Sequence, residues 1–213
     1  MKYMCISEGV SLATFTLCTA CCAYLYVRNK GNDRWIALLF VYLGGMQFLE
    51  YLMWTDQKCT GLNQWSTNAG FIHNILQPVV SLAVAYYFLG ELPWYVYAIF
   101  ALYIFTSLPK ILATKKPNQC SRPCNKGSVG LSWEYTDTVY PTYVWGIFCL
   151  ALIAPLTAMK GDGKMYASVV VATYILSHFI SVSRCPNNRG APPNGSWWCL
   201  MAAVLPLITI FKT

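Results

Sequence analysis

Apolar blocks of about 20 residues, separated by short polar segments, dominate this 213-residue sequence. An α-helix rises about 1.5 Å per residue, so a block of this length crosses a hydrocarbon core of ~30 Å. The composition agrees: 56% of the residues are hydrophobic and only 11% are charged, whereas soluble domains carry about 25% charged residues. These features exclude a soluble globular protein and predict an integral membrane protein.

The blocks predict one all-α domain over residues 1–213, a polytopic bundle of seven transmembrane helices. The alternative, a closed barrel, needs strands of ~10 residues that alternate apolar and polar side chains. The block at 35–43 is apolar on all sides, so helices are the remaining way to span the bilayer. The first block lacks a basic leader, and we expect it to be retained. The predicted spans are 5–27, 35–54, 68–89, 92–113, 139–159, 165–183 and 196–211.

Four cysteines in the predicted loops indicate the orientation. With seven spans, the second, fourth and sixth loops share a side with the N-terminus, and Cys59, Cys120, Cys124 and Cys185 all fall in these loops. An even set on one side predicts one or two disulfides in an oxidising compartment. We expect a bridge between loops, with Cys59 as the leading participant. Basic residues near the span ends favour the opposite orientation weakly, and on balance we predict the N-terminus outside or lumenal.

Polar side chains inside the predicted spans gather at the end that carries the cysteine loops. An ionisable group at the centre of a membrane helix costs about 2.5–3.5 kcal/mol, so such residues usually face a cavity or a partner. Three pairs are spaced i, i+3, which places each pair on one helix face. The set predicts a polar intramembrane pocket, although interhelical hydrogen bonds explain such residues equally well. Its members are Glu8, Gln47, Glu50, His73, Asn74, Gln77, His178, Ser181 and Ser196.

Glu50 is the leading charged residue of this predicted pocket. It lies in the run Phe-Leu-Glu-Tyr-Leu-Met-Trp, whose apolar flanks leave its carboxylate no easy route to water. We therefore expect a pocket that binds or translocates a small solute or ion, with Glu50 as the charge-bearing group.

Known chemistries of seven-helix proteins impose residue requirements that limit the alternatives. A retinal protein needs a lysine in the middle of its last helix, and the last predicted span here has only Lys212, at its end. A zinc-dependent lipid hydrolase needs several metal ligands, and with two histidines it would combine His73 and His178 with Glu50 or Glu8. Zinc is therefore expected only under this hydrolase alternative. No Gly-Xaa-Ser-Xaa-Gly motif or P-loop is present.

Three segments together resemble a known family. They are the stretch 47–64, Gln77-Pro78, and Gly195-Ser-Trp-Trp-Cys199. This combination resembles an uncharacterised family of multi-pass, seven-helix membrane proteins from large DNA viruses of algae and protists. The resemblance implies a location in a host or virion membrane and no established activity. It also implies that Glu50, Asn63, Gln77 and the segment from Ser196 to Cys199 matter for whatever the family does.

The net charge of +7 is spread over both predicted sides, which indicates contact with anionic lipid headgroups rather than nucleic acid. A structural or interaction protein of a viral or organelle membrane stays open as a third function, with the loop 115–137 meeting a partner. A homo-oligomer is compatible with each of these functions.

Overall fold

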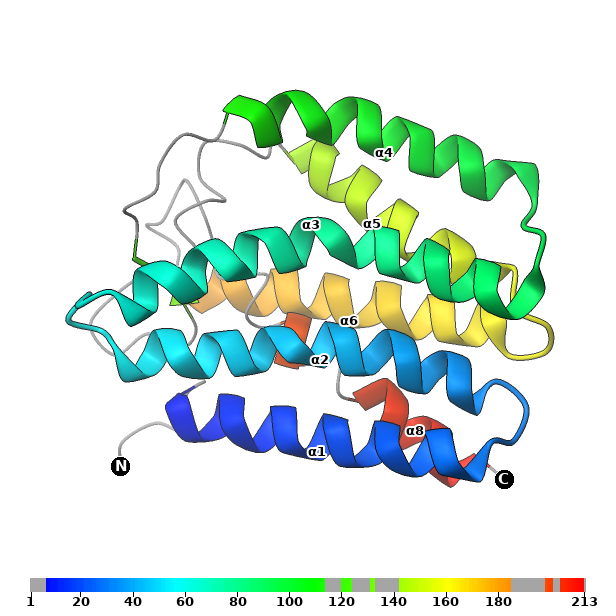
Figure 1. The fold of residues 1–213 in the computed structure, drawn as a ribbon, viewed down its shortest axis with the longest axis horizontal. Coiled ribbons are helices and arrows are strands. Elements are labelled where there is room, and N and C mark those ends of the chain that lie inside the picture. Colours follow the sequence, from blue (N-terminus) through cyan, green and yellow to red (C-terminus); the bar gives the residue numbers. More distant parts are fainter. Residues whose placement is uncertain are drawn as a thin grey trace.

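The chain folds as a set of helices that lie side by side with nearly parallel axes (Figure 1). The computed structural model describes residues 7–113, 120–123, 131–132, 142–184, 198–200 and 204–212. The all-α prediction is confirmed for these residues, apart from a small antiparallel ladder of β1 (Arg122–Pro123) and β2 (Leu131–Ser132). The helices are α1 (Glu8–Arg28), α2 (Asp33–Thr55), α3 (Leu62–Leu89), α4 (Trp94–Ala113), α5 (Thr142–Thr157), α6 (Gly163–Arg184) and α8 (Val204–Phe211).

Most predicted spans coincide with helices to within a few residues, and two differ. Helix α3 begins at Leu62, six residues before the predicted start at 68, because the polar residues that precede the apolar block are helical as well. The predicted span 196–211 is described only in part: residues 198–200 are helical, α8 begins at Val204, and residues 201–203 lie outside the described set.

The bundle has two distinct ends. The start of α1, the α2–α3 turn, the β1–β2 ladder and the end of α6 share one end, on the left of Figure 1. We call it the disulfide end and define it by residues 56–61 and 120–123. The α1–α2 turn, the α5–α6 turn and the end of α8 share the other. We call it the basic end and define it by residues 28–33, 158–163 and 209–212. This arrangement agrees with the loop parity that the sequence predicted.

Helix α2 forms the centre of one half of the bundle, between α1 and α3, and α5 contacts α3, α4 and α6 in the other half. Small residues let these helices approach closely. A Cβ atom at Gly44 would lie 2.7 Å from Sγ of Cys18 on α1, and one at Gly70 on α3 would lie 2.9 Å from Cε of Met46 on α2. Neither glycine can be enlarged without moving its neighbour.

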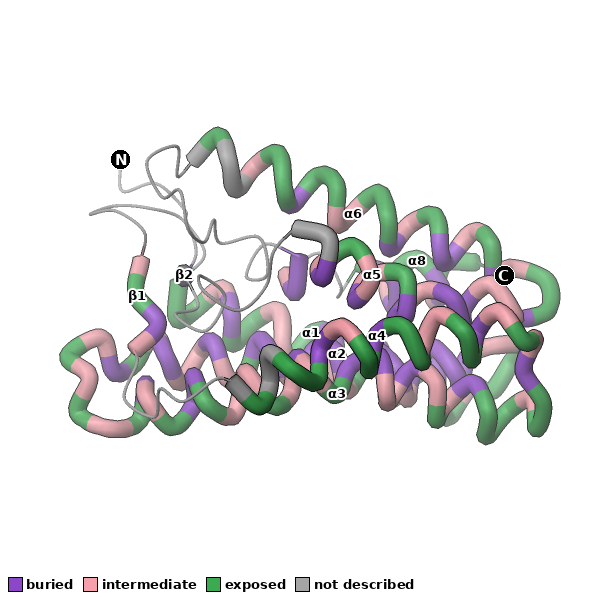
Figure 2. Tube along the Cα trace, turned by 90° about the horizontal axis from the view of Figure 1, so that it is seen from above, coloured by how far each residue is buried: buried purple, intermediate pink, exposed green. Residues whose placement is uncertain are grey.

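Helix α3 buries its polar face and exposes its apolar face. Its buried residues are Asn63, Ser66, Thr67, Gly70, Asn74, Gln77, Pro78, Ser81 and Ala85. Apart from Asn68 and Ala83, its exposed residues are large and apolar or aromatic: Leu62, Trp65, Ile72, Leu76, Tyr86, Tyr87 and Phe88. Burial alternates along every helix of the bundle (Figure 2), but the polarity of the two faces of α3 is the reverse of that of an amphipathic helix in a soluble protein.

Candidate functional site

The most buried charged group of the predicted pocket is the carboxyl group of Glu50, one turn before the end of α2. Glu50 and Gln47 are both fully buried, and Nε2 of Gln47 donates a hydrogen bond of 2.7 Å to Oε2 of Glu50. The i, i+3 spacing therefore brings these two side chains together as the sequence predicted. Oε1 of Gln47 has no hydrogen-bond partner among the described residues.

Apolar side chains lie next to the Glu50–Gln47 pair along α2. Met46 and Met53 lie one turn before and one turn after Glu50, and they form a small buried cluster with Leu131 and Cys199. The members of this cluster come from α2, from the β2 strand and from the start of the last helical segment.

Asn63, in the first turn of α3, is the centre of a second buried polar group at the disulfide end. Its Nδ2 donates to the carbonyl oxygens of Met53 at 2.8 Å and of Ser121 at 3.0 Å. Its Oδ1 accepts from the N–H of Ser121 at 2.8 Å and from Oγ1 of Thr67 at 3.1 Å. The hydroxyl groups of Thr67 and Ser121 lie 3.0 Å apart and complete the group. We call these three residues the Asn63 network.

Asp56 caps the helix that carries Asn63. Its Oδ2 accepts from the N–H groups of Gly61 at 3.1 Å and Asn63 at 3.0 Å, and its Oδ1 accepts from the N–H and the hydroxyl of Thr60 at 2.9 Å. These bonds satisfy amide groups at the start of α3 that have no partner within the helix. They favour the charged carboxylate and lower the pKa of Asp56 to about 2.

Cys59 and Cys120 lie at disulfide-bonding distance, with their Cα atoms 6.1 Å apart. The prediction that Cys59 pairs with a cysteine of another loop agrees with this geometry. Cys120 directly precedes Ser121, so the cysteine pair and the Asn63 network hold the same segment on the α2–α3 turn. Cys124 and Cys185, the other two candidates, lie outside the described residues.

Of the predicted pocket residues on α3, Asn74 and Gln77 are buried and His73 is half-buried, and they occupy different levels of the helix. The ring of His73 stacks on Tyr42 with centroids 4.2 Å apart, and the Tyr42 hydroxyl donates to the backbone oxygen of His73 at 3.1 Å. Nε2 of His73 and Nε2 of Gln77 are buried without a hydrogen-bond partner in the described part of the chain. Asn74 is buried as well.

Glu8 and His178 do not line a buried pocket. Glu8 is exposed in the first turn of α1, and His178 is exposed on α6. The buried face of α6 runs through Ala167, Val170 and Ser177, and His178 is one residue, about 100° of helix rotation, away from Ser177. The side chain of Ser181 and the whole of Ser196 lie outside the described residues.

The zinc alternative has no ligand set in the described residues. No group of three His, Cys, Asp or Glu side chains that could hold a metal ion occurs among them, and His73, His178, Glu50 and Glu8 are all described.

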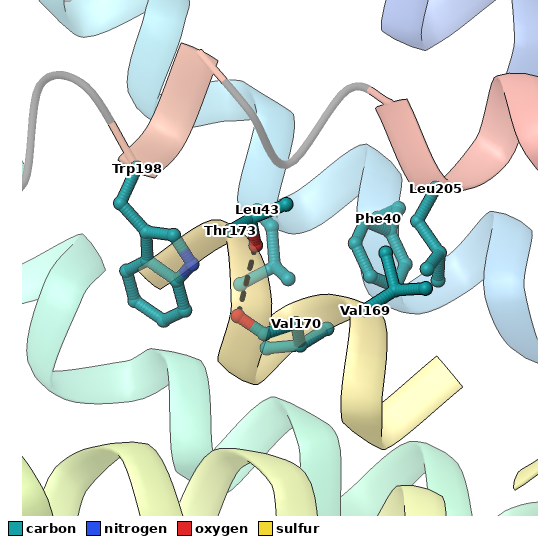
Figure 3. Close-up of a pocket in the computed structure, with 7 residues that line it drawn as sticks. All are labelled: Phe40, Leu43, Val169, Val170, Thr173, Trp198 and Leu205. Atoms are coloured by element: carbon teal, nitrogen blue, oxygen red, sulfur yellow. Dashed lines mark hydrogen bonds between the residues drawn. The ribbon is translucent and has the colours of Figure 1, made fainter. Parts of the chain in front are cut away.

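A small cavity between α2, α6 and α8 offers no binding site (Figure 3). Its volume is about 10 Å³, which is at the lower limit for a single water molecule. Its one hydroxyl group, on Thr173, already donates to the carbonyl of Val170 at 2.8 Å. The lining is otherwise apolar: Phe40, Leu43, Val169, Val170, Trp198 and Leu205.

The pocket prediction missed residues of the α2–α3 turn, of the first turns of α3 and of the segment 120–123. Asp56, Thr67 and Ser121 were not among its candidates, and Asn63 entered only through the family resemblance. The polar run 60–68 was the available signal, because a stretch of that polarity at a helix start needs partners for its side chains.

Comparison with known proteins gives one match. Residues 9–128 match the model of a family of unknown function, DUF5765. This segment contains Glu50, the Asn63 network and the cysteine pair. No curated protein matches the chain, and no solved structure matches it.

Proposed function

The chain belongs to DUF5765, a family of unknown function, and we propose its function from the geometry and from the sequence pattern. The protein is a seven-helix membrane protein that binds or translocates a small solute or ion at the Glu50–Gln47 pair. One observation carries the proposal: a carboxyl group is fully buried, beside an amide, inside a bundle whose outer face is apolar. The viral origin that the sequence resemblance implies is part of the proposal and places the protein in a host or virion membrane.

The distribution of apolar residues supports the membrane part of the proposal. Helices α1, α2 and α3 are long and apolar enough to cross a membrane, and α4 and α5 contain shorter apolar stretches, 94–109 and 144–157. In lipid, the outer face of a bundle is apolar while small and polar side chains hold the helices together. The reversed polarity of α3 fits that environment, and so do the exposed Trp94, Phe105 and Leu112 of α4.

The chemistry of the pair supports the functional part. A carboxylate in apolar surroundings is stable only when it is paired, or when it takes up a proton. Gln47 stabilises it through Nε2 and presents Oε1, which lacks a donor among the described residues. A carboxylate oxygen and an amide oxygen are the ligand atoms that hard cations prefer. The site is therefore suited to a proton, a small cation or a solute that donates hydrogen bonds.

The positions of the cysteines support an orientation. A bridge between Cys59 and Cys120 requires an oxidising compartment. The N-terminus and the disulfide end then face the outside or a lumen, and the basic end faces the cytoplasm. Glu50 lies one turn and a half from the disulfide end, so the oxidising compartment is the nearer one to this buried site.

The direct test compares Glu50→Gln with wild type in proteoliposomes, with proton, sodium and potassium fluxes and the uptake of small metabolites as readouts. Glutamine accepts the hydrogen bond from Gln47 through its own amide oxygen, so the fold is retained while the charge is lost. The matched control is Glu8→Gln, which removes an exposed carboxylate from the same end of the bundle. We expect a flux or binding signal that Glu50→Gln abolishes and Glu8→Gln retains. Identical behaviour of all three proteins, in every assay, rejects transport and binding at this pair.

A purely structural role is the competing function, because a buried Glu–Gln hydrogen bond can simply hold helices together. The two roles predict different stabilities. A packing role predicts that Glu50→Ala lowers the melting temperature in detergent sharply, because it leaves Gln47 without its acceptor. A ligand-binding role predicts that Glu50→Ala loses ligand-induced stabilisation, whereas its melting temperature without ligand changes little.

A further inference from the structure

An open cleft lies at the basic end, on the opposite side of the bundle from Glu50. Its volume is about 350 Å³. Three segments that are distant in the sequence form it: the α1–α2 turn, the α5–α6 turn and the end of α8. Its charged lining residues are Arg28, Lys30, Asp33, Lys160, Asp162 and Lys212.

Tertiary hydrogen bonds fix the walls of this cleft. The guanidinium of Arg28 donates to Asp33 at 2.7 and 2.8 Å and to the carbonyl oxygens of Thr209 at 2.9 Å and Ile210 at 2.8 Å. It therefore joins α1, α2 and the last turn of α8. Nδ2 of Asn32 donates to the carbonyl of Lys160 at 2.9 Å, which joins the α1–α2 turn to the α5–α6 turn. The cleft is thus part of the folded bundle and not a gap between loose turns.

The charges of the cleft leave two cations without an acidic partner. Arg28 pairs with Asp33, and Lys212 pairs with Asp162. Lys30 and Lys160 form no ion pair with any described residue, and both side chains are exposed. The helices α2 and α6 begin at the cleft and α1 and α8 end there, so their dipoles oppose one another and the positive field comes from the side chains. The sum is a pre-formed concave site with a net charge of +2.

We infer that this cleft binds a phosphate group, held between the side chains of Lys30 and Lys160. The chemistry suits a phosphodiester of an anionic lipid headgroup and the phosphate of a soluble ligand equally well. The inference does not depend on the Glu50 site, because the two sites lie at opposite ends of the bundle. Only the lipid source depends on the proposal that this end faces a membrane surface.

The test measures binding to the purified full-length chain in detergent by native mass spectrometry, with two probes. The first probe is phosphatidylglycerol, compared with phosphatidylcholine of the same acyl chains. The second is inorganic phosphate, added as a competitor of phosphatidylglycerol and alone in a thermal-shift titration. The variants are K30Q/K160Q, the charge-retaining K30R/K160R, and the control K58Q/K164Q. Lys58 and Lys164 are exposed and do not line the cleft.

We expect K30Q/K160Q to weaken phosphatidylglycerol binding by about 30-fold, from the loss of two basic side chains near an anionic group. K30R/K160R retains binding, and K58Q/K164Q changes it by less than about twofold. Selective binding of phosphatidylglycerol without competition by phosphate identifies a lipid headgroup as the ligand. Binding of phosphate alone identifies a soluble phosphorylated ligand. The inference is overturned if K30Q/K160Q and K58Q/K164Q lose binding equally, or if neither of them loses it. It is also overturned if wild type binds neither probe.

Discussion

The two ends of the bundle hold their polar groups by different means. At the disulfide end, Asn63, Thr67 and Ser121 are buried and neutral, and they bond to one another and to the backbone. At the basic end, Lys212 and Asp162 form an exposed ion pair at the wall of an open cleft. The first arrangement excludes water, whereas the second lies beside it.

This difference indicates a division of roles. A buried neutral network depends on each of its hydrogen bonds, because no water replaces a partner that is removed. Ionic groups beside water can exchange one partner for another at little cost. The disulfide end is therefore suited to fix the structure around Glu50, and the basic end to bind an ionic ligand.

Asn63→Ala tests the first half of this comparison and has the largest expected effect. The substitution removes four hydrogen bonds and leaves the N–H and carbonyl of Ser121 buried without these partners. We expect a loss of about 3–5 kcal/mol in the free energy of unfolding, measured by denaturant titration in detergent micelles. Asn68→Ala, at an exposed asparagine of the same helix, is the control. Equal effects of the two substitutions would show that burial of the network does not determine stability.

The cysteine pair gives the second largest expected effect. Cys59 and Cys120 are separated by 61 residues, and a bridge that closes a loop of this length stabilises a protein by about 2–4 kcal/mol, mainly by restricting the unfolded chain. We expect C59S/C120S to be less stable by this amount. Dithiothreitol should lower the melting temperature of wild type and leave that of the variant unchanged. A wild type that is insensitive to the reductant would show that the pair is not bonded.

The sequence predicted the helices well because their signal is local. A block of about 20 apolar residues marks a helix whatever lies around it, and the ranges 35–54 and 92–113 differ from α2 and α4 by at most two residues at either end. The start of α3 was missed because four of the six residues 62–67 are polar, and hydropathy alone assigns this stretch to a loop. They are helical because Asp56 caps the start of the helix. In addition, Ser121, more than 50 residues later in the chain, accepts a hydrogen bond from the side chain of Asn63.

The candidate site could be predicted only where the residues share one helix. Gln47 and Glu50 are three residues apart on α2, and the structure joins them. Whether His178 is buried depends on the rotation of α6 about its axis. That rotation follows from contacts with other helices, which the sequence does not specify. The pairing of Cys59 with Cys120 likewise required the position of a distant loop: spacing restricted the choice to four cysteines but could not select two of them.

Asp33→Asn tests the basic end, with an intermediate effect. The side chains of Arg28 and Asp33 are 13% and 4% exposed, whereas those of Lys212 and Asp162 are 41% and 40% exposed. Removing the charge of Asp33 leaves a largely buried guanidinium without its anion, and we expect a loss of about 2–3 kcal/mol in the free energy of unfolding. Asp162→Asn, the matched control, should cost less than about 0.5 kcal/mol because its pair is exposed. A larger loss of stability in Asp162→Asn than in Asp33→Asn would show that burial does not determine which of the two ion pairs contributes more to stability.

Asp56 gives the smallest expected effect and shows how an ionised group contributes at the disulfide end. Its pKa is lowered from 3.8 to about 2 by hydrogen bonds from backbone N–H groups, so the unfolded chain takes up a proton before the folded protein does. The stabilisation is therefore complete above about pH 4 and is lost as the pH falls toward 2. Asp56→Asn places an amide N–H₂ against the N–H groups of Gly61 and Asn63, or loses those bonds.

We expect this variant to melt a few degrees below wild type at neutral pH, and the difference between the two to shrink as the pH falls from about 4 to about 2. Melting curves in detergent over that range measure the difference directly. High salt should leave the difference in melting temperature nearly unchanged, because the partners of Asp56 are backbone amides rather than a cation. In contrast, high salt should reduce the loss of stability in Asp33→Asn, because that loss comes from an ion pair. A difference that is independent of pH but sensitive to salt would show that the carboxylate acts through nearby charges and not as the cap of α3.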